Sequence, residues 1–100
     1  MGRPAARIGD ADVVHCSTPF RAMGSINVLI NFRGASRQGD FNTPHLLPCG
    51  CPPCCCIHSA PIAVGSPTVY INGRQAGRIG DPIAGCTIVG QGSPNVLIGP

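Results

Sequence analysis

The chain has 100 residues, a formal net charge of +3, and glycine (14) and proline (11) contents well above ordinary usage. A chain of this length forms one domain, residues 1–100, and so much glycine and proline excludes extensive helix. No run reaches the about 20 apolar residues of a membrane-spanning helix. The N-terminus also lacks the apolar stretch of a signal peptide. We therefore expect an all-β protein that is made in the cytoplasm.

The N-terminal segment contains the first copy of a sequence repeat, R-x-A-x-R-x-G-D, which we call the frame. Its three copies lie at residues 3–10, 33–40 and 74–81. A repeat with a fixed internal pattern indicates the architecture before any local pattern does. Three copies in one small domain predict a closed body with approximate threefold symmetry. We expect a small cone of β-hairpins with pseudo-threefold symmetry, rather than an open solenoid.

A short strand-like run belongs to each copy of the frame, at residues 28–30, 69–71 and 96–98. The run that belongs to the first copy stands at the C-terminal end of the chain. The first hairpin is therefore divided between the two ends of the sequence. We expect the termini to be adjacent and the N- and C-terminal strands to pair.

The turns of the hairpins differ between repeats. Asn72-Gly73 is the strongest hairpin signal in the chain, because both residue types tolerate the positive φ that a type I′ turn needs. The second repeat has Asn31-Phe32 at the same place. We expect a different turn there.

The second repeat is also longer than the first. Asp40 follows Asp10 by 30 residues, whereas Asp81 follows Asp40 by 41. The additional residues fall at about 46–64, a region rich in cysteine and proline. We interpret this region as a surface loop inserted in one repeat.

All seven basic residues are arginine, and all four acidic residues are aspartate. Six of the arginines occupy the two arginine positions of the repeat frame, and Arg21 lies outside it. We interpret the arginines as structural residues that pair with a repeat aspartate or a backbone carbonyl. The alternative is a basic surface for nucleic acid. Arginines that symmetry distributes around a small body, without aromatic stacking residues, make a poor surface of that kind.

A side chain that can bind a metal follows each repeat aspartate by five residues: His15, His45 and Cys86. Symmetry brings equivalent positions together at the axis, and the remaining histidine, His58, completes a tetrahedral set. Zinc prefers nitrogen and sulfur ligands, although the sequence does not separate zinc from iron. A small domain of this composition needs an additional stabilising cross-link, and a structural zinc ion contributes about 10–16 kcal/mol of apparent binding free energy. We expect one structural Zn²⁺ ion.

The other cysteines leave several interpretations open. Cys16 competes with His15 as a ligand, but adjacent residues of an extended strand point in opposite directions. Five lie in the inserted region: Cys49, Cys51, Cys54, Cys55 and Cys56. They could form a second metal site through the Cys51-x-x-Cys54 spacing, a disulfide within the loop, or a set of reduced thiols packed as small apolar groups. We favour no second metal, because no further histidine or carboxylate lies nearby.

We expect that the protein is not an enzyme. Four protein ligands would close the metal site, whereas catalytic zinc keeps an open position and needs a general base nearby. The chain has no glutamate, and the repeat frame uses most of its aspartates. No metalloprotease motif, nucleophile elbow or phosphate-binding glycine loop is present.

Residues Pro4-Ala5-Ala6-Arg7 spell the name of the PAAR-repeat proteins, and the chain resembles that family over essentially its whole length. The resemblance includes the strand G-S-P-x-V-x-I-N-G at residues 65–73, a partial copy at residues 92–98, and the R-I-G-D that follows. It implies a sharp cone of β-hairpins with a metal, usually zinc, near the vertex. The family holds that metal with three histidines and one cysteine, which match His15, His45, His58 and Cys86.

The resemblance also implies a role. Members of the family cap the trimeric VgrG-type spike of the type VI secretion system and related contractile tails. We therefore expect a spike tip that assists membrane puncture and effector recruitment. It would touch the target membrane transiently, without stable insertion or nucleic-acid binding, and would be expelled to the extracellular space or target cell. The sequence ends after its last repeat strand, so we expect no toxin extension.

Three alternatives compete with this role. The first is a free-standing structural zinc-binding module that recognises protein or nucleic acid. The second is a secreted protein stapled by disulfides, although the cysteine count is odd. A hydrolase that uses the metal ranks last. The effector and the face that docks the spike stay open.

Overall fold

The computed structural model describes residues 2–14, 17–48 and 55–99, which form strands and no helix. No helix in these ranges is therefore long and apolar enough to cross a membrane. The strands pair as four two-stranded antiparallel sheets, β1 with β8, β2 with β3, β4 with β5, and β6 with β7. Their bounds are β1 Arg3–Pro4, β2 Leu29–Ile30, β3 Arg33–Gly34, β4 His45–Pro48, β5 Cys55–His58, β6 Tyr70–Ile71, β7 Arg74–Gln75 and β8 Leu97–Ile98. The all-β prediction is confirmed.

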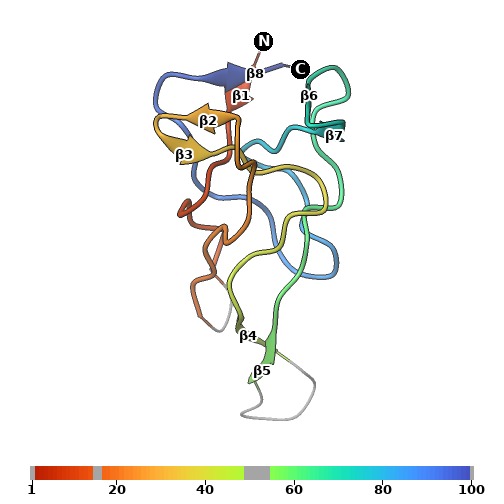
Figure 1. Ribbon diagram of the computed structural model, residues 1–100. Coiled ribbons are helices and arrows are strands. Elements are labelled where there is room, and N and C mark those ends of the chain that lie inside the picture. The colour runs from red at the N-terminus through yellow and green to blue at the C-terminus, as the bar shows by residue number, and fades with distance from the viewer. Residues whose placement is uncertain (1, 15–16, 49–54, 100) are drawn as a thin grey trace.

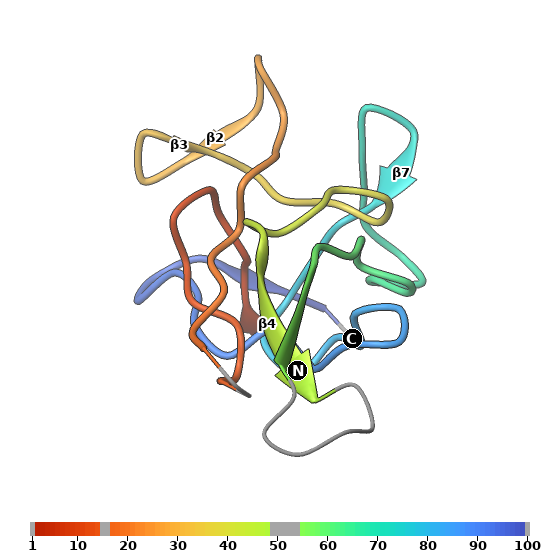
Figure 2. The same ribbon diagram turned by 90° about the horizontal axis from the view of Figure 1, so that it is seen from below.

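The molecule tapers from a wide end to a narrow end, with principal extents of 41 × 23 × 23 Å. Figure 1 shows three hairpins and both chain termini at the wide end, and the β4–β5 hairpin at the narrow end. Seen from below, the three hairpins surround a centre over which β4 lies (Figure 2). Arg3 pairs with Ile98 across β1 and β8, so the terminal strands form one hairpin as predicted.

The hairpins β2–β3 and β6–β7 have the same turn. Asn72 and Gly73 have φ of 53° and 79°, the positive values that a type I′ turn needs. Asn31 and Phe32 have φ of 53° and 67°, so the prediction of a different turn in the second repeat is wrong. Phe32 adopts a conformation that glycine prefers, and its side chain is 96% exposed. The ladder bonds of the hairpin determine the turn here, despite the residue type.

The core of the wide end is made of three equivalent pairs of small and branched side chains. Each strand that precedes a frame contributes one isoleucine, and each frame contributes its alanine. The six buried residues are Ala5, Ala35, Ala76, Ile30, Ile71 and Ile98. The alanines are completely buried, because they lie where the three repeats come closest. Larger side chains at these positions would push the repeats apart.

A ring of backbone hydrogen bonds joins the repeats around the axis. Ala6 N donates to Gly77 O (2.9 Å), Gly77 N donates to Ser36 O (2.8 Å), and Ser36 N donates to Ala6 O (3.0 Å). The residue at this position is Ala, Ser or Gly. A Cβ at Gly77 would lie 2.8 Å from the side chain of Ile62. The close approach therefore needs small residues.

The arginines of the frame connect the repeats at their side chains. Within each repeat the second arginine pairs with the repeat aspartate, as Arg7 does with Asp10 at 2.8 Å. The first arginine reaches the aspartate of a neighbouring repeat. These contacts join Arg33 to Asp10 (2.9 Å), Arg74 to Asp40 (3.2 Å) and Arg3 to Asp81 (3.2 Å), which closes the ring. The structural interpretation of the frame arginines is confirmed.

The inserted region is more ordered than the predicted surface loop. Its flanks form β4 and β5, with His45 opposite His58 and Pro48 opposite Cys55. The hairpin continues the taper beyond the three repeats (Figure 1). The loop prediction is therefore wrong for residues 46–48 and 55–58. Residues 49–54, which include Cys49, Cys51 and Cys54, lie outside the described residues.

Candidate metal centre

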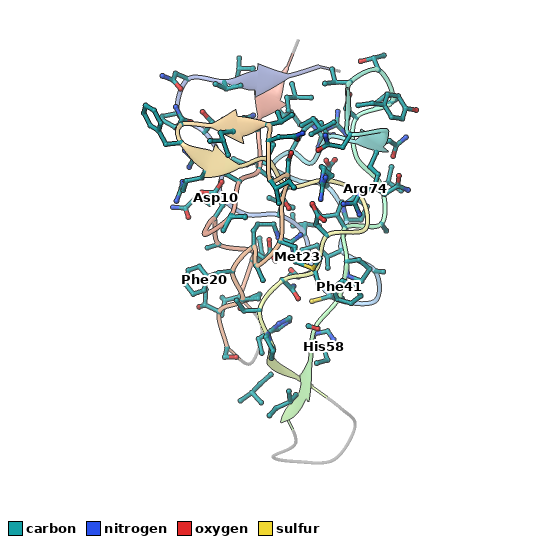
Figure 3. All side chains as sticks on the ribbon, in the orientation of Figure 1. Asp10, Phe20, Met23, Phe41, His58 and Arg74 are labelled. Atoms are coloured by element: carbon teal, nitrogen blue, oxygen red, sulfur yellow. The ribbon has the colours of Figure 1, made fainter. Side chains whose placement is uncertain are left out.

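Three of the predicted ligands meet where the repeats converge, at the base of the β4–β5 hairpin. His45 begins β4 and His58 ends β5, and the two face each other in the strand register. Cys86 comes from a tight turn in the third repeat, in which Cys86 N donates to Ile83 O at 3.0 Å. Gly85 has a φ of 60° and permits that turn. Figure 3 shows His58 in the narrow half of the molecule, at the upper end of this hairpin.

The three ligand atoms lie close enough to share one ion. His45 Nε2 is 2.8 Å from His58 Nε2 and 3.2 Å from Cys86 Sγ. His58 Nε2 is 3.3 Å from Cys86 Sγ. Zinc bonds of about 2.0–2.1 Å to nitrogen and 2.3 Å to sulfur give ligand separations only slightly longer than these. The residues present therefore fit a metal with nitrogen and sulfur ligands, and they could hold a metal ion.

The orientation of His45 suits a metal ligand. Its Nδ1 lies 2.7 Å from the carbonyl oxygen of Thr43, which can only accept a hydrogen bond. Nδ1 therefore carries the proton, and Nε2, which faces Cys86 and His58, presents its lone pair. Such a hydrogen bond to the far nitrogen is the usual way in which proteins orient a ligating histidine.

The thiol of Cys86 lies in an environment that disfavours its charged form. Burial raises the pKa of Cys86, while a hydrogen bond from Asn42 opposes that rise. A thiol must lose its proton when it binds a metal. Metal binding at this site would therefore release a proton.

A buried polar layer lies directly above the ligands, and sequence reasoning missed it. Arg21 Nη2 is 2.9 Å from Asp12 Oδ2, and Asn42 Nδ2 is 3.1 Å from the same oxygen. All three side chains are at most 3% exposed. Burial raises the pKa of Asp12, and the positive charge of Arg21 opposes the rise. We call these three residues the polar layer.

A signal for the polar layer was present in the sequence. Asp12 and Asn42 each follow a repeat aspartate by two residues, and Ile83 is the third member of that set. All three are buried. The offset of five residues gives the ligands, and the offset of two gives a buried layer one step closer to the wide end.

The remaining predicted site residues have different outcomes. His15 and its competitor Cys16 lie outside the described residues, so the fourth ligand stays a prediction. Beyond that gap, Ser17 Oγ accepts a hydrogen bond from Leu46 N at 2.9 Å, next to β4. Cys55 and Cys56 lie in β5.

Comparison with protein families supports the interpretation of the repeats. The family model of the PAAR motif matches residues 46–90. This range includes His58 and Cys86 and begins directly after His45. A comparison with curated proteins found no match.

Proposed function

Because this chain is a PAAR-repeat protein, we propose that it caps the trimeric VgrG-type spike of a contractile secretion apparatus as a metal-stabilised sharp tip. A PAAR motif fits a spike-tip role in contractile injection systems. The tip would assist membrane puncture, and it would recruit effectors for delivery. It would be loaded in the cytoplasm and expelled with the spike, with only transient contact with the target membrane.

The observation that carries this proposal is the threefold equivalence of the wide end. Leu29, Tyr70 and Leu97 occupy the same position in the three hairpins and are 57%, 58% and 61% exposed. The residue that follows each of them is buried in the core. Three matching apolar side chains suit a partner whose surface repeats every third of a turn. A trimer with true threefold symmetry has such a surface.

The narrow end supports the mechanical part of the proposal. At this end a single hairpin of two four-residue strands, β4 and β5, extends beyond the three repeats, and an isolated two-stranded hairpin is only marginally stable in water. An ion held by His45, His58 and Cys86, with His15 as the proposed fourth ligand, would join the repeats where they converge. When bound, a zinc or iron ion supplies strong bonds between segments distant in sequence. The role is structural, so we propose no enzymatic activity.

The alternative is a free-standing structural zinc-binding module that binds protein or nucleic acid. The ion pairs of the arginines argue against a surface that binds nucleic acid. Arg21 and the six frame arginines each pair with an aspartate. A cation that is already paired is poorly placed to neutralise phosphate.

A pull-down with the VgrG-type spike trimer tests the proposal. Wild-type protein should be retained, and Tyr70→Asp should abolish retention, because it places a charge in the apolar contact. Ile57→Asp is the matched control, since Ile57 is 76% exposed but lies in β5 at the narrow end. The control should be retained like wild type. Failure of the wild type to bind, with metal and with chelator, would contradict the proposal.

A further inference from the structure

Asn42 occupies the centre of the polar layer, where three segments of the chain meet. Its side chain is 2% exposed, and it contacts the predicted ligand Cys86. Asn42 Nδ2 lies 3.1 Å from Asp12 Oδ2 and 3.9 Å from Cys86 Sγ. Its Oδ1 accepts a hydrogen bond from Ala60 N at 2.9 Å. Ala60 is two residues beyond His58.

The orientation of this amide follows from its partners. A backbone N–H can only donate, so the atom that faces Ala60 must be the amide oxygen. The amide nitrogen therefore faces Asp12 and Cys86, and its two N–H groups suffice for both. Arg21 holds Asp12 in place through a 2.9 Å ion pair, and it also donates to the carbonyl oxygen of Asp40 at 3.0 Å. The amide thus presents a fixed donor to the sulfur.

We propose that Asn42 is a positioning residue of the metal centre, which orients the Cys86 sulfur by hydrogen bonding. This inference rests on the proposed metal site. A donor to a metal-bound thiolate fixes the direction of the sulfur and draws electron density from it, so the sulfur donates less electron density to the ion. Through Ala60, the same amide ties the sulfur to the segment that carries His58. Asp12 and Arg21 act by fixing the amide.

The experiment uses Co²⁺ as the probe, because cobalt takes the same ligands as zinc and shows a thiolate-to-metal charge-transfer band. Wild-type protein is titrated first, and a band with one ion per chain establishes the metal site itself. Asn42→Leu should then move the band to longer wavelength and weaken metal binding by about 10- to 100-fold. Asn42→Asp keeps an acceptor for Ala60 N, but it replaces the amide donors with a carboxylate beside Asp12. It serves if the leucine variant does not fold, and should shift the band likewise.

Two controls separate positioning from general destabilisation. Ile83→Val changes packing at the equivalent buried position of the third repeat, and it should leave the band where it is. In a Cys86→His background, which keeps a ligand but removes the sulfur, Asn42→Leu should cost less than about threefold in affinity. An equal loss with and without the sulfur, or an unmoved band, would overturn the role of Asn42 while leaving the metal site intact. Absence of metal binding by wild type would overturn both.

Discussion

Arg33 of the second repeat donates to Asp10 of the first, with 2.9 Å between Nη2 and Oδ1. Asp10 is completely buried, and it also accepts hydrogen bonds from the backbone N, Nε and Nη2 of Arg7. One aspartate thus closes the turn of its own repeat and holds the neighbouring repeat. The frame R-x-A-x-R-x-G-D is therefore a connector between repeats, in which the first arginine acts across the interface and the second acts locally.

Removal of Asp10 and removal of Arg33 should lower the free energy of unfolding by unequal amounts. Asp10→Ala leaves the buried Arg7 without its carboxylate and should lower the free energy of unfolding by about 3–5 kcal/mol. Arg33→Ala should cost about 0.2–1 kcal/mol, because the Arg33 side chain is 40% exposed and water replaces the lost contact. Chemical denaturation of the metal-loaded variants measures both values. Equal losses would show that the contact with Arg33 accounts for the whole contribution of Asp10, and would contradict a separate local role of Arg7.

One substitution in the turn of the second repeat should stabilise the protein. Phe32 is an exposed residue at a φ of 67°, a region that costs a non-glycine residue about 1–2 kcal/mol. Phe32→Gly should therefore raise the free energy of unfolding by up to about 1 kcal/mol, since added freedom of the unfolded chain offsets part of the gain. Thermal unfolding with equal metal loading measures the change.

Gly73 provides the matched control for that turn. A Cβ at Gly73 would meet no atom within 4 Å, so Gly73→Ala tests the backbone conformation alone. It should lower the free energy of unfolding by about 1 kcal/mol at a φ of 79°. A loss in both variants would mean that the Phe32 side chain has a stabilising contact.

Removal of the metal or of any ligand should loosen the narrow end. A chelator should lower the melting temperature of wild type, and His45→Ala should abolish stoichiometric zinc binding because it removes the most buried of the three described ligands. His15→Ala should have the same effect, whereas Cys16→Ser should bind zinc normally. Zinc content per chain, measured after dialysis, distinguishes the two neighbours. Normal zinc in His15→Ala would eliminate it as the fourth ligand.

Metal affinity should rise with pH. The pKa of Cys86 is raised by burial, so below that pKa the ion must displace a proton from the thiol. Each unit of falling pH should then cost about tenfold in affinity, because one proton competes with the ion for the sulfur. Competition with a chelator from pH 6 to pH 8 measures the slope. Cys86→His should make the affinity nearly independent of pH above about pH 7.

Much of the site was readable from the repeat register. The shared offset from the aspartate placed His45 and Cys86 at equivalent positions, and the structure brings them to 3.2 Å. The repeat pattern does not point to His58, which the sequence offers only as the remaining histidine. The structure supplies the physical reason, which is that β4 and β5 pair with His45 opposite His58. The sequence of the inserted region predicts a loop because proline and glycine interrupt the alternating pattern that is typical of a strand.

The sequence by itself determined the threefold frame, the division of one hairpin between the termini, and the residue types that meet at the axis. These follow from repetition, which needs no knowledge of packing. The tertiary structure alone establishes which repeat each first arginine contacts, the turn at Phe32, and the place of Arg21 in the polar layer. Cross-repeat hydrogen bonds, ladder geometry and burial govern those features, and they arise only when segments distant in the chain are in contact.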